Sequence, residues 1–164
     1  MSVSIVQYNN DDLPQMIRIW NDIVEDGISF PEEQVLNPHS GKSFFGAQTY
    51  CAVAKNNYGD ILGFYMIHPN NVGRCGHICN AIYAVNKDSR GHHIGEKLVA
   101  DSIKQAKHQG FRILQFDAVV ESNIHARHLY EKMGFVQLGT IPGGFRMKDG
   151  TYANICPYYH TLED

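Results

Sequence analysis

The residues best suited to chemistry lie where an apolar segment runs through a turn into a helix. The segment from Ala81 to Val85 is apolar, and a short polar turn separates it from the loop Arg90, Gly91, His92, His93, Ile94 and Gly95. A helix that begins in such a loop leaves its first backbone N–H groups unpaired and adds the positive end of its dipole. This stretch therefore predicts a site for a phosphate or diphosphate, bound by the backbone.

The spacing of apolar residues after Ile94 predicts the helix that would carry this site. Leu98, Val99, Ile103 and Ala106 fall on one helical face, and charged residues fill the opposite one. We expect Gly95 to face the sheet, where a residue without Cβ lets two backbones approach closely. Glycines that serve packing alone would give the same pattern, so a turn without any ligand is the alternative at this point.

A second stretch, from Asn123 to Phe135, strengthens the ligand-binding interpretation. It lies about thirty residues after the loop and reads Asn-Ile-His-Ala-Arg-His-Leu-Tyr-Glu-Lys-Met-Gly-Phe. The two stretches together resemble the acetyl-CoA-binding motifs of GCN5-related N-acetyltransferases, the GNAT superfamily. Those motifs are Arg/Gln-x-x-Gly-x-Gly/Ala after the fourth strand and Asn-x-x-Ala-x-x-Leu-Tyr-x-x-x-Gly-Phe. The resemblance covers roughly residues 78 to 140.

The chain departs from the family pattern at one position. His93 stands where the family has the first glycine of the loop. The family uses the backbone N–H at this position, so a histidine would serve there on condition that its φ is negative.

The resemblance implies how acetyl-CoA, the cosubstrate, would be bound. Main-chain groups of Tyr83, Ala84 and Val85 would pair with the pantetheine amides, and the amides from Arg90 to Gly95 would bind the diphosphate. Asn123 would hydrogen-bond the cofactor, although an ordinary helix cap explains an asparagine there nearly as well.

Tyr130 is the candidate general acid. Its place in the second motif matches the family tyrosine whose hydroxyl points at the cofactor sulfur, and a phenol holds its proton at neutral pH. A tyrosine on the apolar face of a helix is otherwise a core residue, so the assignment depends on the motif.

The general base is not identified by the sequence. Many family members use a carboxylate on the fourth strand, but the segment His-Ile-Cys-Asn-Ala at 77–81 carries none. Asn80 would orient the amine, a water or a substrate carboxylate. The segment is similar to that of fungal acetyltransferases acting on proline analogues such as azetidine-2-carboxylate, which favours a small amino acid as acceptor. Glu25 is a candidate for acceptor binding and for a base acting through water; a solvated helix end is its alternative.

A metal site is the remaining alternative for the histidines and cysteines. Cys75, His77 and Cys79 would point to one face of a strand. Because no second Cys/His pair lies nearby in the sequence, we expect no metal.

The order of apolar patterns predicts a mixed α/β (α+β) fold. We expect strands at 3–8, 48–55, 61–68, 77–85, 111–120, 135–141 and from Tyr152, with helices after Pro14, from Ile94 to Gly110 and from Asn123 to Gly134. Residues 28–45 read as a loop with at most a short helix, and Pro157 predicts a sheet edge. The arrangement implied is the GNAT fold: one twisted, mostly antiparallel sheet with helices on both faces, strands four and five splayed apart.

Composition sets broad limits on the protein. Its 164 residues fit one domain, spanning 1–164, and a net charge of −3 argues against general affinity for nucleic acid. The sequence has no apolar run long enough to span a membrane, and its four cysteines fit a reducing compartment, so we expect a cytoplasmic protein that binds neither membrane nor nucleic acid.

The favoured hypothesis is an N-acetyltransferase that moves an acetyl group from acetyl-CoA to an amine of a small molecule, by direct attack in a ternary complex. The main alternative is a non-catalytic acyl-CoA-binding or sensing module on the same fold, and a weaker one is a His/Cys metalloprotein. A protein lysine also stays open as acceptor. The resemblance further makes a homodimer a candidate assembly.

Overall fold

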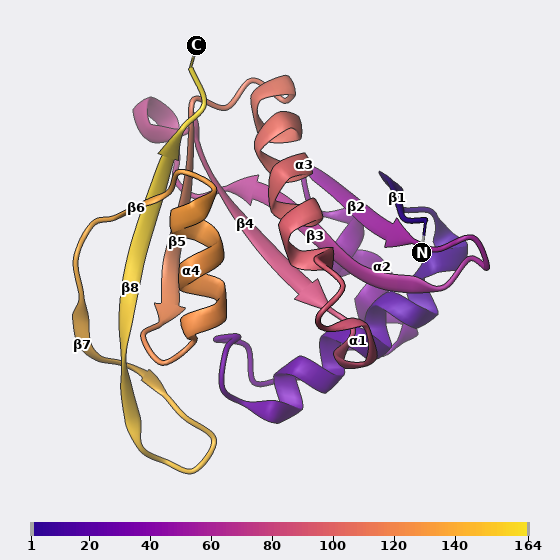
Figure 1. Ribbon diagram of the computed structural model, residues 1–164, viewed down its shortest axis with the longest axis horizontal. Helices are drawn as coiled ribbons and strands as arrows, with labels where there is room; N and C mark the ends of the chain where they lie inside the picture. Colours follow the sequence, from indigo (N-terminus) through magenta and orange to yellow (C-terminus); the bar gives the residue numbers. More distant parts are fainter. Residues whose placement is uncertain (1, 164) are drawn as a thin grey trace.

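Eight strands form one sheet in the computed structural model, which describes residues 2–163 (Figure 1). The sheet order is β1-β2-β3-β4-β5-β8-β6, and β7 also pairs with β8. Every pairing is antiparallel except that of β4 with β5. The strands are β1 (Ser4–Gln7), β2 (Tyr50–Lys55), β3 (Ile61–Pro69), β4 (Ile78–Val85), β5 (Ile113–Val120), β6 (Val136–Gln137), β7 (Ile141–Arg146) and β8 (Tyr152–Thr161).

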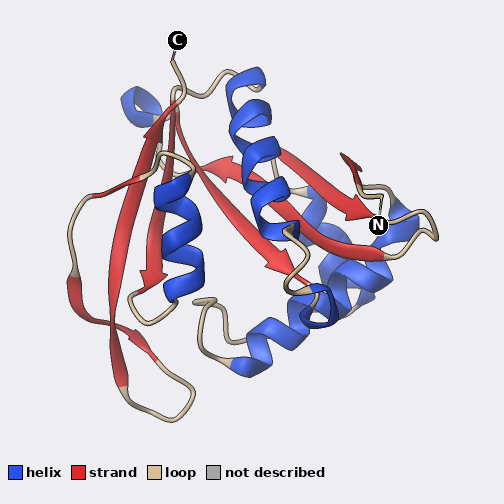
Figure 2. Ribbon diagram, viewed as in Figure 1, coloured by secondary structure: helices blue, strands red, loops and turns tan. Residues whose placement is uncertain are grey.

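Helices cover both faces of the sheet (Figure 2). They are α1 (Leu13–Asp26), α2 (Pro38–Gly46), α3 (Ile94–His108) and α4 (Ile124–Lys132). Leu98 of α3 and Leu129 of α4 belong to one apolar cluster on the sheet. Trp20 of α1 and Phe45 of α2 belong to the cluster on the opposite face. The expected GNAT fold is confirmed, with α3 and α4 on one side and α1 and α2 on the other.

The helix ends follow from local sequence. The Asn37 side chain accepts a hydrogen bond from the Ser40 backbone N–H and so caps α2, and Asn123 caps α4 in the same way. Gly27 follows α1 in the left-handed conformation, with φ +65°, which a glycine adopts at little cost. The predicted stop of the first helix at Gly27 and the predicted cap at Asn123 are therefore confirmed, whereas the cap of α2 was not predicted.

The two central parallel strands separate along their length. β4 and β5 pair at Ile78 with Ile113, at Cys79 with Leu114 and at Asn80 with Gln115. In the described part of the chain their pairing ends there, although β4 continues to Val85 and β5 to Val120. The backbone of β4 from Ala81 onward therefore has no strand beside it on the β5 side, and its polar groups there need another partner.

Two predictions near the C-terminus are wrong. Residues 135–141 do not form one strand, because β6 covers two residues and β7 starts at Ile141. Pro157 does not mark an edge, because β8 lies between β5 and β6. It instead falls where the β5–β8 register shifts between Phe116 and Val119, a bulge that tolerates a residue without an N–H group.

Candidate active site

The predicted phosphate loop is open to solvent at the start of α3. Arg90, Gly91, His92 and His93 are exposed, whereas Ile94 is buried beneath them. Gly91 has φ +84°, and a Cβ built on it would meet no atom within 4 Å. The His93 side chain makes no capping hydrogen bond to α3, unlike the asparagines that cap α2 and α4. The first amides of α3 are thus uncapped by a side chain and fit an anion.

The condition placed on His93 is not met, so that expectation is wrong. Its φ is +59° and its ψ +25°, and it is the one non-glycine residue with positive φ among residues 2–163. This left-handed conformation costs a residue with a Cβ about 1 kcal/mol or more. His93 Nδ1 lies 3.6 Å from the Glu96 carboxylate, so the ring is drawn toward the first turn of α3. His93 therefore adopts the backbone of the glycine it replaces.

The charges beside this loop are balanced by a second helix. Glu96, in the first turn of α3, lies 3.1 Å from Lys132 Nζ at the end of α4. The hydrogen bond from Lys132 lowers the pKa of the Glu96 carboxyl group. Gly95 lies nearby, and a Cβ on it would be 3.4 Å from Leu129 and 3.9 Å from Val85. Gly95 thus faces the sheet, as expected, and also packs against α4.

Tyr130 lies in an aromatic cluster beside the point where β4 and β5 separate. Its ring centroid is 4.4 Å from that of Phe116 on β5 and 6.1 Å from that of Tyr83 on β4. Burial, with a smaller contribution from Tyr158, raises the pKa of the Tyr130 hydroxyl. The phenol therefore keeps its proton at neutral pH, as a general acid requires.

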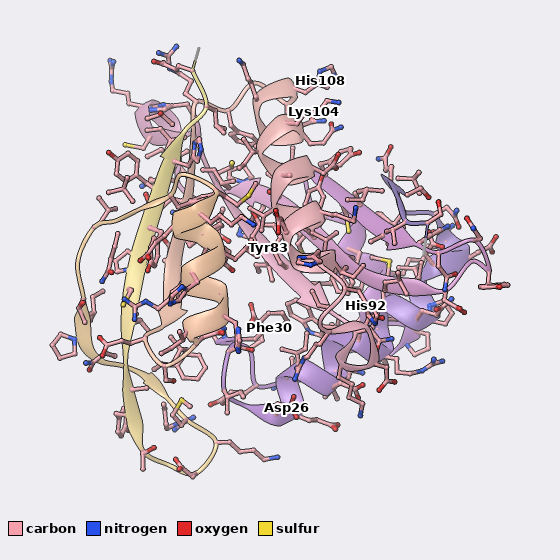
Figure 3. All side chains as sticks on the ribbon, in the orientation of Figure 1. Asp26, Phe30, Tyr83, His92, Lys104 and His108 are labelled. Atoms are coloured by element: carbon pink, nitrogen blue, oxygen red, sulfur yellow. The ribbon has the colours of Figure 1, made fainter. Side chains whose placement is uncertain are left out.

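The side chain of Tyr83 has a different task. Its hydroxyl lies 2.6 Å from Ser102 Oγ on α3, and Figure 3 shows Tyr83 between α3 and α4. It belongs to the packing of this face of the sheet. Ala84 is buried on the opposite face, against α1. Only the backbone of these residues is therefore placed for the pantetheine contacts predicted from the resemblance.

Asn123 acts as a helix cap. Its side-chain oxygen accepts a hydrogen bond from the backbone N–H of Ala126 at 3.4 Å. Because the cap uses the oxygen, a contact with a cofactor would use the amide nitrogen.

Polar side chains from three neighbouring strands line up on the face toward α1. His68 pairs with Asn80 across β3 and β4, and Asn80 pairs with Gln115 across β4 and β5. Residues paired across neighbouring strands point to the same face of a sheet. Every second residue of a strand does so too, and Ile82 and Ala84, two and four residues after Asn80, pack on the α1 side. Asn80 therefore also lies on that side. The Asn80 amide donates to the Gln115 backbone carbonyl at 3.0 Å. Asn80 thus links β4 to β5 at the last pair before they separate.

Two atoms near this row have no hydrogen-bond partner among the described residues. They are His68 Nδ1 and Glu32 Oε2, both inaccessible to solvent. Burial lowers the pKa of His68, while the carboxylates of Asp117 and Glu32 act in the opposite direction. Asp117 accepts hydrogen bonds from Asn70 at 3.0 Å and from Gln115 at 2.8 Å. Neither His68 nor Glu32 was predicted from the sequence. The sequence does contain one indication of His68: it continues the alternation of the buried residues Phe64 and Met66 along β3, where an apolar residue would be expected.

Glu25 lies at the other end of β4. It lines a cavity of about 270 Å³ together with Val85, Arg90 and Lys148. The Lys148 ammonium donates to the Glu25 backbone carbonyl at 2.7 Å, which ties the β7–β8 hairpin to the end of α1. Asn80 and Val85 are five residues apart on one strand, roughly 16 Å at about 3.3 Å per residue. The structure thus brings Glu25 to the phosphate loop, and it does not bring it to Asn80.

The histidines and cysteines do not assemble into a metal site in the structure of residues 2–163: no group of three or more His, Cys, Asp or Glu side chains is arranged to hold an ion. The expected strand face is also wrong for Cys75, which belongs to a 3-10 turn, η2 (Gly73–Cys75), because β4 begins later. Cys79 is buried in the core, whereas Cys75 is exposed.

Among the described helices, none is long and apolar enough to cross a membrane.

Comparison with known proteins places these features in one family. The family model described as "Acetyltransferase (GNAT) family" matches residues 13–135. The chain is 35% identical over 108 residues to N-acetyltransferase aca1 of Schizosaccharomyces pombe, a match that covers 63% of this chain and 52% of aca1. The chain therefore spans about half the length of that relative.

Two further proteins are similar over most of the chain. The L-methionine sulfoximine/L-methionine sulfone acetyltransferase of Pseudomonas paraeruginosa is 28% identical over 148 residues, covering 87% of this chain and 85% of that protein. The solved structure of yncA, a putative acetyltransferase from Salmonella typhimurium with its cofactor acetyl-CoA, superposes with a TM-score of 0.92. It is 15% identical and covers 100% of this chain and 96% of that one, so this likeness concerns the fold.

Proposed function

We propose, from the premise that the chain belongs to the acetyltransferase (GNAT) family, that it transfers an acetyl group from acetyl-CoA to an amine of a small molecule. One observation carries the proposal: β4 and β5 separate after Asn80, and the unpaired length of β4 runs from the protonated phenol of Tyr130 toward the uncapped start of α3. Residues 1–164 would form one catalytic domain that acts in the cytoplasm.

The chain's own residues fit acetyl-CoA, which supplies an acetyl group on a thioester. The amides from Arg90 to Gly95 would bind the diphosphate, since the loop is exposed and no side chain caps α3. Main-chain groups of Tyr83, Ala84 and Val85 would meet the pantetheine arm, because β5 does not pair with them. The Asn123 amide nitrogen would add one hydrogen bond. The acetyl-CoA in the yncA structure supports this fit.

Tyr130 would donate the proton that the departing sulfur needs. A positioned acid of this kind contributes typically about 10²–10⁴-fold to a rate. Burial of Tyr130 among aromatic rings raises the pKa of its hydroxyl group, which keeps the proton in place until negative charge develops beside it.

The acceptor would reach the acetyl group from the α1 side, where Asn80 lies. The relative that acetylates methionine sulfoximine supports a small amino acid or a close analogue, and the Asn80 amide is suited to orient it. Glu25 would contact a part of the acceptor that extends toward Arg90, since both line one cavity.

Two copies of the chain would form a homodimer, which light scattering of the purified protein tests directly.

Release of free thiol from acetyl-CoA in the presence of single amines tests the proposal. The panel contains methionine sulfoximine, azetidine-2-carboxylate, polyamines and a lysine peptide, and mass spectrometry identifies the product. We expect amine-dependent thiol release with one of the small amines. Binding of acetyl-CoA without turnover by any amine would instead support an acyl-CoA sensor. Turnover of the peptide alone would shift the acceptor class to proteins.

A further inference from the structure

The row of polar residues on the α1 face contains a group that the transfer reaction needs. Attack on a thioester requires a neutral amine, whereas a small aliphatic amine in neutral solution carries a proton. Asn80 has no titratable group, and Glu25 lies at the far end of β4. The base must therefore come from another residue on the face that receives the acceptor.

His68 has the position and the chemistry for this role. It is the β3 partner of Asn80, so it stands one strand away from the last β4–β5 pair and on the same face. Its Nδ1 is inaccessible to solvent and has no hydrogen-bond partner in the described part of the chain, although a buried ring nitrogen is normally paired. An unpaired nitrogen next to the acceptor face is free to bind a proton.

Acidic groups on two other elements face the same position. Asp117 on β5 and Glu32, from the segment between α1 and α2, are the charged groups that act on His68, and its β4 neighbour Asn80 is neutral. Glu32 Oε2 is itself buried without a partner among residues 2–163. A buried carboxylate oxygen without a partner is costly, and an ammonium ion is the ligand that would satisfy it.

We propose that His68 is the general base of the acetyl transfer and that Glu32, with Asp117, binds the acceptor as its ammonium ion. This inference rests on the proposed function and defines its substrate as a cationic primary or secondary amine.

The proton balance of this step is complete. His68 Nδ1 takes one proton from the ammonium nitrogen and releases it to solvent after the product has left. The nitrogen then forms its bond to the acetyl carbon, the carbon–sulfur bond breaks, and Tyr130 gives its proton to the sulfur. The second proton of the amine restores Tyr130 through water. The products are the amide, the free thiol and one proton, and no further reactant is needed.

The pH dependence follows from the environment of His68. Its pKa is lowered from its ordinary value of 6.5, chiefly by burial. The ring is therefore neutral and ready to accept a proton at pH values where a solvated histidine is still partly charged. We expect the acidic limb of kcat/KM against pH to fall below pH 6.5, where His68 becomes protonated.

The test compares His68→Gln with wild-type protein, on the best amine of the panel. We expect kcat near pH 7 to fall by about 10²–10⁴-fold and the acetyl-CoA affinity to stay unchanged. The acidic limb due to His68 should disappear, and the rate should instead rise with the fraction of the amine that is deprotonated in solution. His68→Gly with added imidazole should recover part of the rate. His39→Gln, an exposed histidine of α2, is the control and should keep the wild-type profile.

Glu32→Gln tests the ammonium site, with its neighbour Glu33 as matched control. Glu33 is exposed and pairs with Arg146, so Glu33→Gln should leave the KM for the amine near the wild-type value. Glu32→Gln should raise that KM by about tenfold or more, the loss expected for a charge-assisted hydrogen bond. An active wild type whose His68→Gln variant keeps the same rate and pH profile would overturn this inference and leave the proposed function standing. A wild type without amine-dependent turnover would overturn the proposed function itself.

Discussion

The cofactor side and the acceptor side of this site are built in different ways. In the proposed site, the cofactor side would use backbone groups from Tyr83 to Gly95, around the start of α3, together with the side chains of Asn123 and Tyr130. The acceptor side would use side chains from separate elements: His68 of β3, Asn80 of β4, Asp117 of β5 and Glu32 of the α1–α2 segment. A ligand bound by backbone groups tolerates substitutions that keep the backbone conformation. A ligand bound by side chains does not tolerate substitution of those side chains.

This difference predicts where specificity resides. Acetyl-CoA is common to the family, and a backbone site for it tolerates many side chains, His93 in a glycine conformation included. The acceptor differs between relatives, and it would meet side chains whose identity changes with each substitution.

Tyr130→Phe should give the largest loss, because it removes the proposed proton donor, whereas binding would depend on other groups. We expect turnover to fall by about 10²–10⁴-fold with little change in acetyl-CoA affinity. Tyr83→Phe is the matched control, since its hydroxyl contacts Ser102 and its side chain serves packing. Steady-state kinetics measures the turnover and calorimetry measures the acetyl-CoA affinity of both variants. Full activity of Tyr130→Phe across the pH range would contradict the acid assignment.

Ile94→Pro should weaken cofactor binding through the backbone. Proline is tolerated at the first position of a helix, so α3 should form, but the residue lacks an N–H group and disfavours the conformation of His93 before it. Loss of one hydrogen bond to a charged group predicts about 10–100-fold weaker acetyl-CoA binding. Ile94→Val, which keeps the N–H group, is the control in the same titration. Equal affinities of the two variants would exclude these amides from the site.

Asn123 variants separate a helix cap from a cofactor contact. Asn123→Ser keeps a capping oxygen and loses the amide nitrogen, so we expect an unchanged melting temperature with acetyl-CoA binding weaker by about threefold to tenfold. Asn123→Ala should show the weaker binding together with a melting temperature lower by about 2–4 °C, since the lost cap costs about 1 kcal/mol. If serine restores the affinity as well as the melting temperature, Asn123 is a cap alone.

Lys148→Ala should give the smallest effect, and it should fall on the acceptor side. The substitution removes the hydrogen bond from Nζ to the Glu25 carbonyl but keeps the Cβ that packs on Gly27. We expect the KM for the amine to rise by about twofold to threefold, because a solvent-exposed hydrogen bond contributes about 0.5 kcal/mol. Lys104→Ala, on the exposed face of α3, is the control. A change in acetyl-CoA affinity instead would place the hairpin on the cofactor side.

The same division explains what the sequence predicted. The loop at 90–95 and the helix after Asn123 are continuous, with glycines and caps that have local causes, so their positions follow from local rules. His68 and Glu32 are distant from both motifs in the sequence, and the register of β3 against β4 brings His68 to Asn80. That register depends on how two separate strands pair, so no single segment of the sequence predicts it. The left-handed backbone of His93 was missed because its residue type favours a negative φ, and the bulge at Pro157 was missed because it depends on the register of β8 against β5.

A crystal structure with coenzyme A bound tests the central claim most directly, because it shows both motifs and the acceptor face together. We expect the diphosphate on the amides of residues 90–95, the pantetheine arm beside the backbone of β4 where β5 has separated, and the sulfur within hydrogen-bonding distance of the Tyr130 hydroxyl. A coenzyme bound elsewhere, or a sulfur on the far side of β4 from Tyr130, would contradict it.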